Sequence, residues 1–342
     1  MNKKPKSKKR VYLQERDTEV MRTLARYGLL RLSTLHALCF SSLKHQENVQ
    51  KKLKRLIDNK YIFRKFPEIR RRSLDDTADK KQDLFEKHRR EQVFCLDKRG
   101  AEEIGLEKFD SRFRKMLGPD KNTPHHRLDI ADVRACFELA VEADNDIGLA
   151  VWWDEYEKNE DDEYVIRMER KNGIQIVDPD SGKERTLPLC PDGCFVLQDL
   201  QSGKRDLFFL EVDEGTESGK KRWYDKILAY RAFGQRGFKQ HFPQFAKNGF
   251  RVLTVNRSET GKQQLKRTQG LIEATHNARG AKRFWFCPFE GVMPEECASA
   301  DYILDAPVWF RVKLDELADL AQKGHGLRLA DFLFDRDREP RP

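Results

Sequence analysis

The stretch "LCPDGCFVLQDLQSGKRDLFFLEVD", Leu189–Asp213, predicts two β-strands joined by a Ser-Gly turn, with one acid near its start and two at its end. Successive side chains of a strand point to opposite faces, so Glu211 and Asp213 share one face of the second strand. A turn centred on Ser202–Gly203 pairs residues whose numbers sum to about 405. This register sets Asp192 opposite Asp213, or one or two residues earlier if the register slips.

Three carboxylates are therefore expected at one end of this hairpin, from Asp192, Glu211 and Asp213. Like charges held close together raise one another's pKa, and a bound divalent cation relieves the repulsion. Hard oxygen ligands suit Mg²⁺ or Mn²⁺ better than zinc. The pattern predicts a metal site. The alternative is that the two aspartates lie in water at the strand ends and that Glu211 pairs with a lysine or arginine.

The segments around this hairpin predict a mixed α/β domain. They comprise a helix over 126–144, strands over 149–153 and 164–168, a hairpin over 174–189, a helix over 217–233, a strand over 250–255, a helix over 263–276 and a strand over 283–289. A helix that leaves one strand and returns to a parallel neighbour makes the usual crossover connection. The expected fold of this segment is therefore a mixed α/β arrangement that includes the acidic hairpin.

Pro191-Asp192 and Glu211-Val212-Asp213, in this order of elements, resemble the motif of PD-(D/E)xK nucleases. The resemblance implies that Asp192 and Glu211 hold Mg²⁺, and that a lysine two residues after the glutamate positions the attacking water. Asp213 stands in that lysine's place in this chain. The resemblance thus leaves two alternatives: a metal-dependent DNA nuclease, or a degenerate site in a protein that binds DNA without cutting it.

In some PD-(D/E)xK members the lysine comes from the following helix, and a helical acid before the first strand adds a metal ligand. On that resemblance Lys226, which shares a helix face with Tyr230, is the candidate lysine, and Lys220 and Lys221 are its competitors. The candidate helical acids are Glu138 first and Asp132 second.

The first hundred residues carry most of the positive charge. They hold 28 Lys and Arg against 13 Asp and Glu, a net charge of +15, in a chain whose net charge is +9, so the remainder carries −6. An excess of this kind favours a polyanionic partner such as DNA. The first eleven residues are expected to form a disordered basic arm, which either lies along phosphates or only aids solubility.

Three helices are predicted in this basic segment. The first ends at Gly28 and buries Val20, Leu24 and Tyr27, and the second has Ser33 as its N-cap. The third, over 44–59, turns Val49, Leu53 and Leu56 inward. Four polar residues recur on its opposite face, and they are Lys44, Asn48, Lys51 and Arg55. A short helix, a turn and a basic helix are typical of a helix-turn-helix.

Strands over 61–66 and 91–96 and a helix that begins after Asp97 complete a pattern that resembles winged-helix domains. The resemblance implies that Lys44, Asn48, Lys51 and Arg55 face DNA from the third helix. It also implies that Arg70, Arg71 and Arg72 lie in the wing. The alternative is a winged helix that contacts proteins and whose basic face is merely solvated.

The expected organisation is a basic arm over 1–11, a winged helix-turn-helix domain over 12–105, a linker over 106–124, a PD-(D/E)xK-like α/β domain over 125–325 and a charged tail over 326–342. The segments "PHHRLDIADVR", "LCPDGCFVL" and "FFLEVDEGTESGKKRWYDKILAY" are similar to the replication-relaxation family of plasmids and other mobile elements. This likeness covers about residues 12–257. It implies a DNA-handling role, with DNA and replication or mobilisation proteins as partners.

Several other classes of protein are disfavoured. No apolar run is long enough to span a membrane, no secretory signal is recognised, and "GTESGKK" lacks the spacing of a nucleotide-binding P-loop.

Seven scattered cysteines indicate a reducing cytoplasm. Cys190, Cys194, Cys287 and Cys297 are either buried thiols or a zinc site, and their spacing does not match a zinc knuckle. A further alternative is an assembly module that docks a partner protein through aromatic strands such as 283–289.

Overall fold

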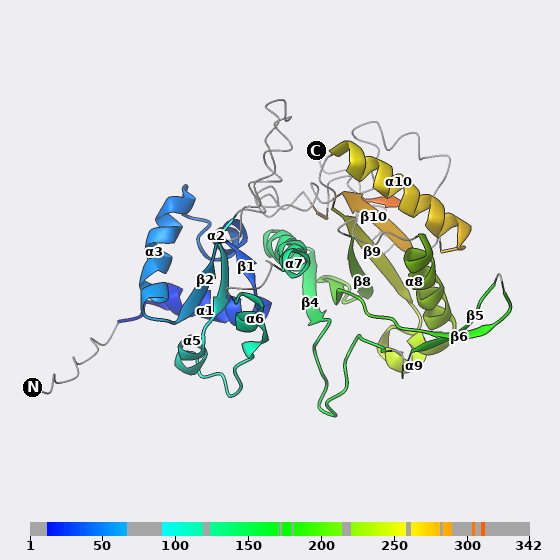
Figure 1. Cartoon of the computed structure of the whole chain (residues 1–342), viewed down its shortest axis with the longest axis horizontal. Coiled ribbons are helices and arrows are strands. Elements are labelled where there is room, and N and C mark those ends of the chain that lie inside the picture. Colours follow the sequence, from blue (N-terminus) through cyan, green and yellow to red (C-terminus); the bar gives the residue numbers. More distant parts are fainter. Residues whose placement is uncertain are drawn as a thin grey trace, which may run out of the picture. The chain divides into compact units, whose positions relative to one another are not determined.

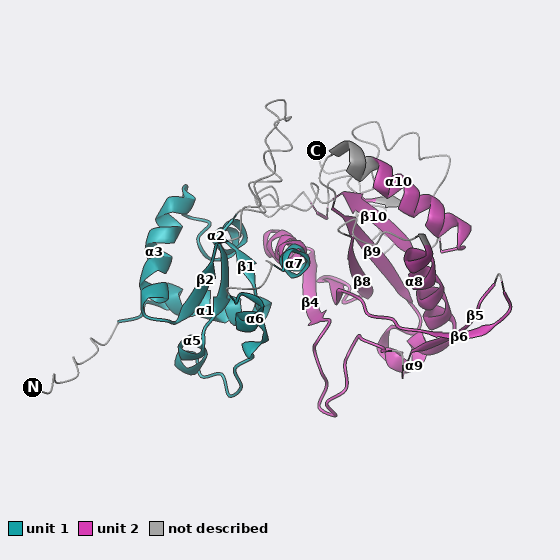
Figure 2. Cartoon of the chain, in the orientation of Figure 1, with its two compact units in different colours: residues 1–76, 86–131 teal, residues 77–85, 132–342 magenta. Residues whose placement is uncertain are grey.

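The computed structural model describes residues 12–66, 91–118, 124–169, 171, 173–179, 181–213, 220–257, 261–280, 283–288, 303–304 and 309–311. Its contacts divide the chain into two compact units (Figure 2). The first comprises residues 1–76 and 86–131, and the second comprises residues 77–85 and 132–342. The expected basic arm over 1–11 and the expected tail over 326–342 lie outside the described residues.

The first unit packs helices on a small antiparallel sheet whose strand order is β1-β3-β2 (Figure 1). Its elements are α1 (Glu15–Tyr27), β1 (Leu30–Arg31), α2 (Leu32–Cys39), α3 (Gln46–Asp58), β2 (Ile62–Lys65), β3 (Val93–Leu96), α5 (Lys98–Glu103) and α6 (Ser111–Met116).

Local sequence explains where the first helices begin and end. Helix α1 starts with a capping box formed by Gln14 and Asp17, and it ends at Gly28, whose φ of +78° suits glycine. The expected start of α2 is wrong: the helix begins at Leu32, and Ser33 lies inside it, where its N–H donates to Glu91 Oε2 at 2.8 Å. The expected burial of Val20, Leu24 and Tyr27 in α1 and of Val49, Leu53 and Leu56 in α3 is confirmed.

The strands of this unit agree with the sequence pattern, and Asp97 caps α5 by accepting from Lys98 N at 2.7 Å. The two-residue strand β1 was not expected. Arg70, Arg71 and Arg72, the predicted wing residues, lie outside the described residues.

Residues 106–124 do not form the simple linker that the sequence suggested. Helix α6 occupies part of this segment, and Leu117 is buried with Leu29, Val93 and Leu128. A helix of only six residues is too short to show a sustained period in the sequence. The boundary between the units lies instead after Ala131, within the long helix α7 (His125–Ala143).

The second unit is built on a six-stranded mixed sheet with the order β11-β10-β9-β8-β7-β4. Strands β4, β7 and β8 are antiparallel neighbours, whereas β8, β9 and β10 are parallel neighbours, as the crossover pattern predicted. The further elements are β4 (Ile147–Asp154), β5 (Ile174–Val177), β6 (Glu184–Leu187), β7 (Gly193–Asp199), β8 (Arg205–Asp213), α8 (Lys220–Ala232), a π-helical turn (Phe233–Gly237), α9 (Phe238–His241), a 3₁₀ turn (Pro243–Phe245), β9 (Phe250–Asn256), α10 (Gly261–Asn277), β10 (Phe284–Pro288) and β11 (Phe310–Arg311).

The hairpin over 174–189 is confirmed as the separate pair β5–β6. The strand expected over 164–168 is wrong, because this segment makes only the isolated bridges Lys158–Tyr164 and Met168–Leu189. Its β-branched and aromatic residues favour extended backbone, yet the structure gives them no neighbouring strand.

Aromatic layers cover both faces of the sheet and fix the direction of the side chains on β8. On one face Phe208 stacks on Phe195, which contacts Phe137 of α7. On the other face Phe209 contacts Tyr230 of α8. Helix α10 lies beside α8, to which it is joined by a hydrogen bond of 3.0 Å from Trp223 Nε1 to Thr275 Oγ1. Glu211 has the same parity as Phe209, so it points toward α8.

Candidate functional site

The candidate site is built around Glu211, near the carboxyl end of the central strand β8. Its side chain is only 2% exposed. Two side chains from α8 engage its two oxygens separately. Lys226 Nζ lies 2.7 Å from Oε2, and the Tyr230 hydroxyl donates to Oε1 at 2.6 Å. Lys226 and Tyr230 were expected to share a helix face because they are four residues apart, and α8 presents both groups to one carboxylate.

Asp192 lies next to this carboxylate, just before β7 begins. Its N–H donates to Leu210 O at 3.0 Å, and its Oδ2 accepts from Val212 N at 2.7 Å. The paired residues of β7 and β8 have numbers that sum to 403, as in Gly193 with Leu210. The first expected register, opposite Asp213, is therefore wrong, and the slipped register is correct. Asp192 comes beside the segment 210–212.

Asp213 has a different environment from the other two acids. Its two oxygens accept from Arg267 of α10, at 2.7 Å from Nε and 3.0 Å from Nη2. Its carbonyl oxygen accepts from Arg257 N at 2.7 Å. A guanidinium that binds both oxygens of a carboxylate neutralises it without a metal. The three-carboxylate cluster expected from the sequence is thus a pair, Asp192 and Glu211, with Asp213 held by an arginine.

Burial and charge perturb the groups of this pair. Burial raises the pKa of Glu211 from 4.5 to about 7, and Asp192 adds to the increase, while Lys226 opposes it by attraction and hydrogen bonding. Burial also raises the pKa of Tyr230 well above its ordinary value, and the neighbouring Glu211 acts in the same direction. A perturbed carboxylate held by a lysine and a second acid is typical of functional sites, although structural ion pairs show similar shifts.

The helical acid proposed from the sequence lies on another part of the second unit. Glu138 Oε1 accepts from Arg134 Nε at 2.9 Å, and Arg134 also donates to Asp154 Oδ2 at 3.0 Å. The Arg134 guanidinium lies over the Trp152 ring, 5.5 Å from its centroid, on the sheet face that α7 covers. Asp132, the second candidate, is buried on α7.

Within the described ranges, no group of three or more His, Cys, Asp or Glu residues is placed to hold a metal ion. The expected metal set that included Asp213 and Glu138 is therefore not assembled there.

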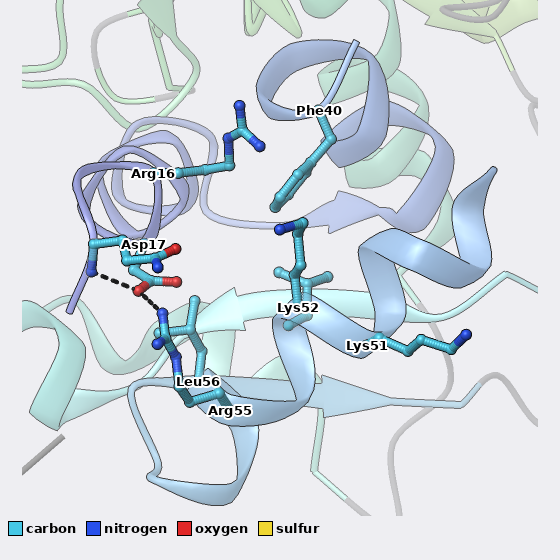
Figure 3. Close-up of a pocket in the computed structure, with 9 residues that line it drawn as sticks. Arg16, Asp17, Phe40, Lys51, Lys52, Arg55 and Leu56 are labelled. Carbon is cyan, nitrogen blue, oxygen red and sulfur yellow. Dashed lines mark hydrogen bonds and ion pairs between the residues drawn. The ribbon is translucent and has the colours of Figure 1, made fainter. Parts of the chain in front are cut away.

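The residues of the third helix that were expected to face DNA divide into three kinds. Asn48 and Lys51 are exposed on α3. Lys44 is also exposed, but it precedes the helix, which begins at Gln46, so the expected spacing along one helix face does not include it. Arg55 forms an ion pair with Asp17 of α1 (Figure 3). Its charge is therefore compensated within the first unit.

The zinc alternative for the cysteines can be examined where the structure describes them. Cys194 and Cys287 are buried, and Cys190 is partly exposed, with its Sγ 3.8 Å from Met168 O. Burial raises the pKa of the Cys194 thiol well above its ordinary value, which keeps the thiol protonated and disfavours metal binding. Cys297 lies outside the described residues.

A comparison with protein families matches residues 21–245, more than half of the chain, to the replication-relaxation family. The chain belongs to the replication-relaxation family. No curated protein and no solved structure matches it. Membership suggests a role in the replication or relaxation of a plasmid or other mobile element.

The matched range of this replication-relaxation protein contains Asp192, Glu211 and Lys226 but not Arg267. Sequence reasoning did not identify Arg267 as the partner of Asp213. It lies on a helix that follows the next strand, 54 residues away, and nothing in its local pattern marks it. In the part of the chain that the structure describes, no helix has both the length and the apolar character needed to cross a membrane.

Proposed function

We propose that this replication-relaxation protein binds DNA through its first unit and hydrolyses phosphodiester bonds at Asp192, Glu211 and Lys226 of its second. One observation carries the proposal: α8 supplies a lysine whose Nζ lies 2.7 Å from Glu211 Oε2, beside Asp192. This lysine takes the role that the PD-(D/E)xK motif gives to the position of Asp213. The site therefore holds the two carboxylates and the lysine that this chemistry needs.

The order of elements supports the same proposal. Helix α7, the antiparallel strands β4, β7 and β8, helix α8 and the parallel strand β9 follow the helix–strand order of PD-(D/E)xK nucleases. Asp192 precedes the second of the three antiparallel strands, and Glu211 lies near the end of the third. These are the places at which the motif carries its acids.

The donor groups fit a hard divalent cation. Asp192 and Glu211 offer carboxylate oxygens from neighbouring strands. Burial is the main cause of the raised pKa of Glu211 and repulsion by Asp192 adds to it, and a bound cation would relieve that repulsion. Mg²⁺ or Mn²⁺ held there would supply a water of lowered pKa and would neutralise charge on the phosphate. Lys226 would orient that water or stabilise the negative charge that develops on the phosphate oxygens. Tyr230 holds Glu211 in place through its other oxygen.

The first unit supports DNA binding. Its order α1-β1-α2-α3-β2-β3 follows that of winged-helix domains, with α3 at the position of the helix that enters the major groove. The first hundred residues carry the net charge of +15. Charge of this sign and density favours the phosphate backbone.

A second candidate function is a DNA-binding accessory of replication or mobilisation that does not cut. One observation favours it: both oxygens of Glu211 are engaged within the protein, by Lys226 and Tyr230. A carboxylate that is already satisfied loses these bonds when it turns to a metal. If the protein has this second function, the Lys226–Glu211 ion pair only stabilises the fold of a nuclease site that has lost its activity. The DNA contacts then belong to the first unit.

A supercoiled-plasmid assay separates the two functions. The wild type, Glu211→Gln and Asp192→Asn are incubated with Mg²⁺, with Mn²⁺ and with EDTA, and DNA binding is measured in parallel. Glu184→Gln, a change at an exposed acid of β6, is the matched control. Divalent-dependent nicking that both site variants lose, while they and the control still bind DNA, supports the nuclease. Binding without nicking by the wild type supports the accessory. Equal nicking by all four proteins contradicts the assigned site.

A further inference from the structure

A pocket between α1 and α3 is lined by four cationic side chains (Figure 3). Its charged and aromatic lining residues are Arg16, Asp17, Phe40, Lys51, Lys52 and Arg55. Four of these six are cations and only one is an acid. None of the four belongs to the acidic site of the second unit, and only Lys51 and Arg55 were expected to face DNA.

The one acid of the pocket is already neutralised. Asp17 Oδ2 accepts from Gln14 N at 2.8 Å in the capping box of α1, and it also pairs with Arg55. Arg55 and Asp17 therefore cancel each other's charge. The excess positive charge of the pocket comes from Arg16, Lys51 and Lys52.

Arg16 and Lys52 both line the pocket and both are exposed. The Arg16 guanidinium lies 5.7 Å from the centroid of the Phe40 ring, and Figure 3 shows the Lys52 side chain turned toward the same ring. Lys51 extends away from them in that view. Phe40 is only 2% exposed, so its ring is buried beneath the cations and is not available to stack against a base. The pocket thus presents charge with little aromatic surface.

We infer that this pocket holds a phosphate of the nucleic-acid backbone between Arg16 and Lys52. The inference deepens the proposed DNA binding and rests on it. Two cations on different helices bind an anion without reading its bases, because phosphate contacts fix position and carry no sequence information. The Arg55–Asp17 pair acts as a positioning element, since it ties the first turn of α1 to α3 and so sets the spacing of Arg16 and Lys52.

The test measures the DNA affinity of the full-length chain by fluorescence anisotropy over a series of salt concentrations, in EDTA so that no cutting occurs. The variants are Arg16→Gln and Lys52→Gln. Lys54→Gln is the matched control, because Lys54 is an exposed lysine of the same helix that does not line the pocket. Loss of one phosphate contact is expected to weaken binding by roughly threefold to tenfold and to reduce the slope of log affinity against log salt by about 1.

The weakening should be the same on two duplexes of unrelated sequence, and Lys54→Gln should bind as the wild type does. Pocket variants that match the Lys54→Gln control, while the wild type binds DNA in a salt-dependent manner, overturn the inference and leave the proposed function intact. A wild type that shows no salt-dependent DNA binding overturns both. Circular dichroism confirms that each variant is folded.

Discussion

Lys226 and Glu211 form an ion pair of 2.7 Å in which the carboxylate is almost completely buried and the ammonium remains partly accessible. The lysine side chain is 26% exposed against 2% for the glutamate. Their environments differ because Glu211 lies on an inner strand of the sheet, whereas Lys226 lies on the helix that covers it. The pair therefore stabilises a buried charge and leaves a cation at the edge of the site.

Replacing Lys226 with methionine should destabilise the protein at pH 8, because an ionised Glu211 would lose its cation. We expect the free energy of unfolding to fall by about 2–4 kcal/mol. At pH 5 the loss should be smaller, since Glu211 is then protonated in the folded state. Urea unfolding at both pH values measures the difference. Lys221→Met, at an exposed lysine of the same helix, is the control, and an equal effect of the two changes would contradict the role of the pair.

The stability of the metal-free protein should depend on pH through Glu211. Its pKa is 4.5 ordinarily and about 7 in the folded protein, so between these values the folded state binds more protons than the unfolded state. The free energy of unfolding should therefore decrease as pH rises through this window, by roughly 3 kcal/mol in total. Urea unfolding in EDTA, as a function of pH, tests this. Glu211→Gln should remove that part of the slope, and an unchanged slope would refute the assignment.

Asp213 and Arg267 should be energetically coupled, because the guanidinium binds both oxygens of a carboxylate that is only 6% exposed. A double-mutant cycle with Asp213→Asn and Arg267→Gln should give an interaction energy of about 1–3 kcal/mol. Unfolding by urea at pH 7 gives the four free energies. Additive effects of the two substitutions would show that the contact does not stabilise the fold.

Gly28→Ala should destabilise the first unit more than Gly105→Ala does. Both glycines have a positive φ, +78° and +73°, so each substitution is expected to cost about 1 kcal/mol through backbone strain. A Cβ at Gly28 would also collide with the Phe113 ring of α6, whereas a Cβ at Gly105 meets nothing within 4 Å. We expect a further cost of about 1–3 kcal/mol at Gly28. Thermal unfolding of the two variants provides the comparison.

The sequence predicted the central part of the site because short-range rules determine it. Alternation along β8 placed Glu211 on one face, and helical spacing placed Lys226 and Tyr230 on one side of α8. The connection between β7 and β8 was harder to predict, since its turn is not centred on Ser202–Gly203. The first register was therefore displaced by two residues. A displacement of two preserves the faces, so the alternation remained correct.

The features that the sequence did not reveal depend on distant partners or on very short elements. The partner of Asp213 comes from α10, and Arg134, which binds Glu138, also binds Asp154 of β4, 20 residues away. Helix α6 contains no buried residue, and the buried Leu117 follows its last residue, so the sequence has no period to detect. Tertiary contacts thus decided which acids became neighbours and which were neutralised separately.

The bidentate contact between Asp213 and Arg267 also restricts how this chain can change. Asp213→Lys would recreate the lysine of the nuclease motif, but it would place an ammonium group against a guanidinium in a nearly buried position. Such a substitution becomes tolerable only when Arg267, 54 residues away, changes as well. The two positions are therefore expected to vary together among related chains: an acid at one with a base at the other, or a lysine at the first with a neutral or acidic residue at the second.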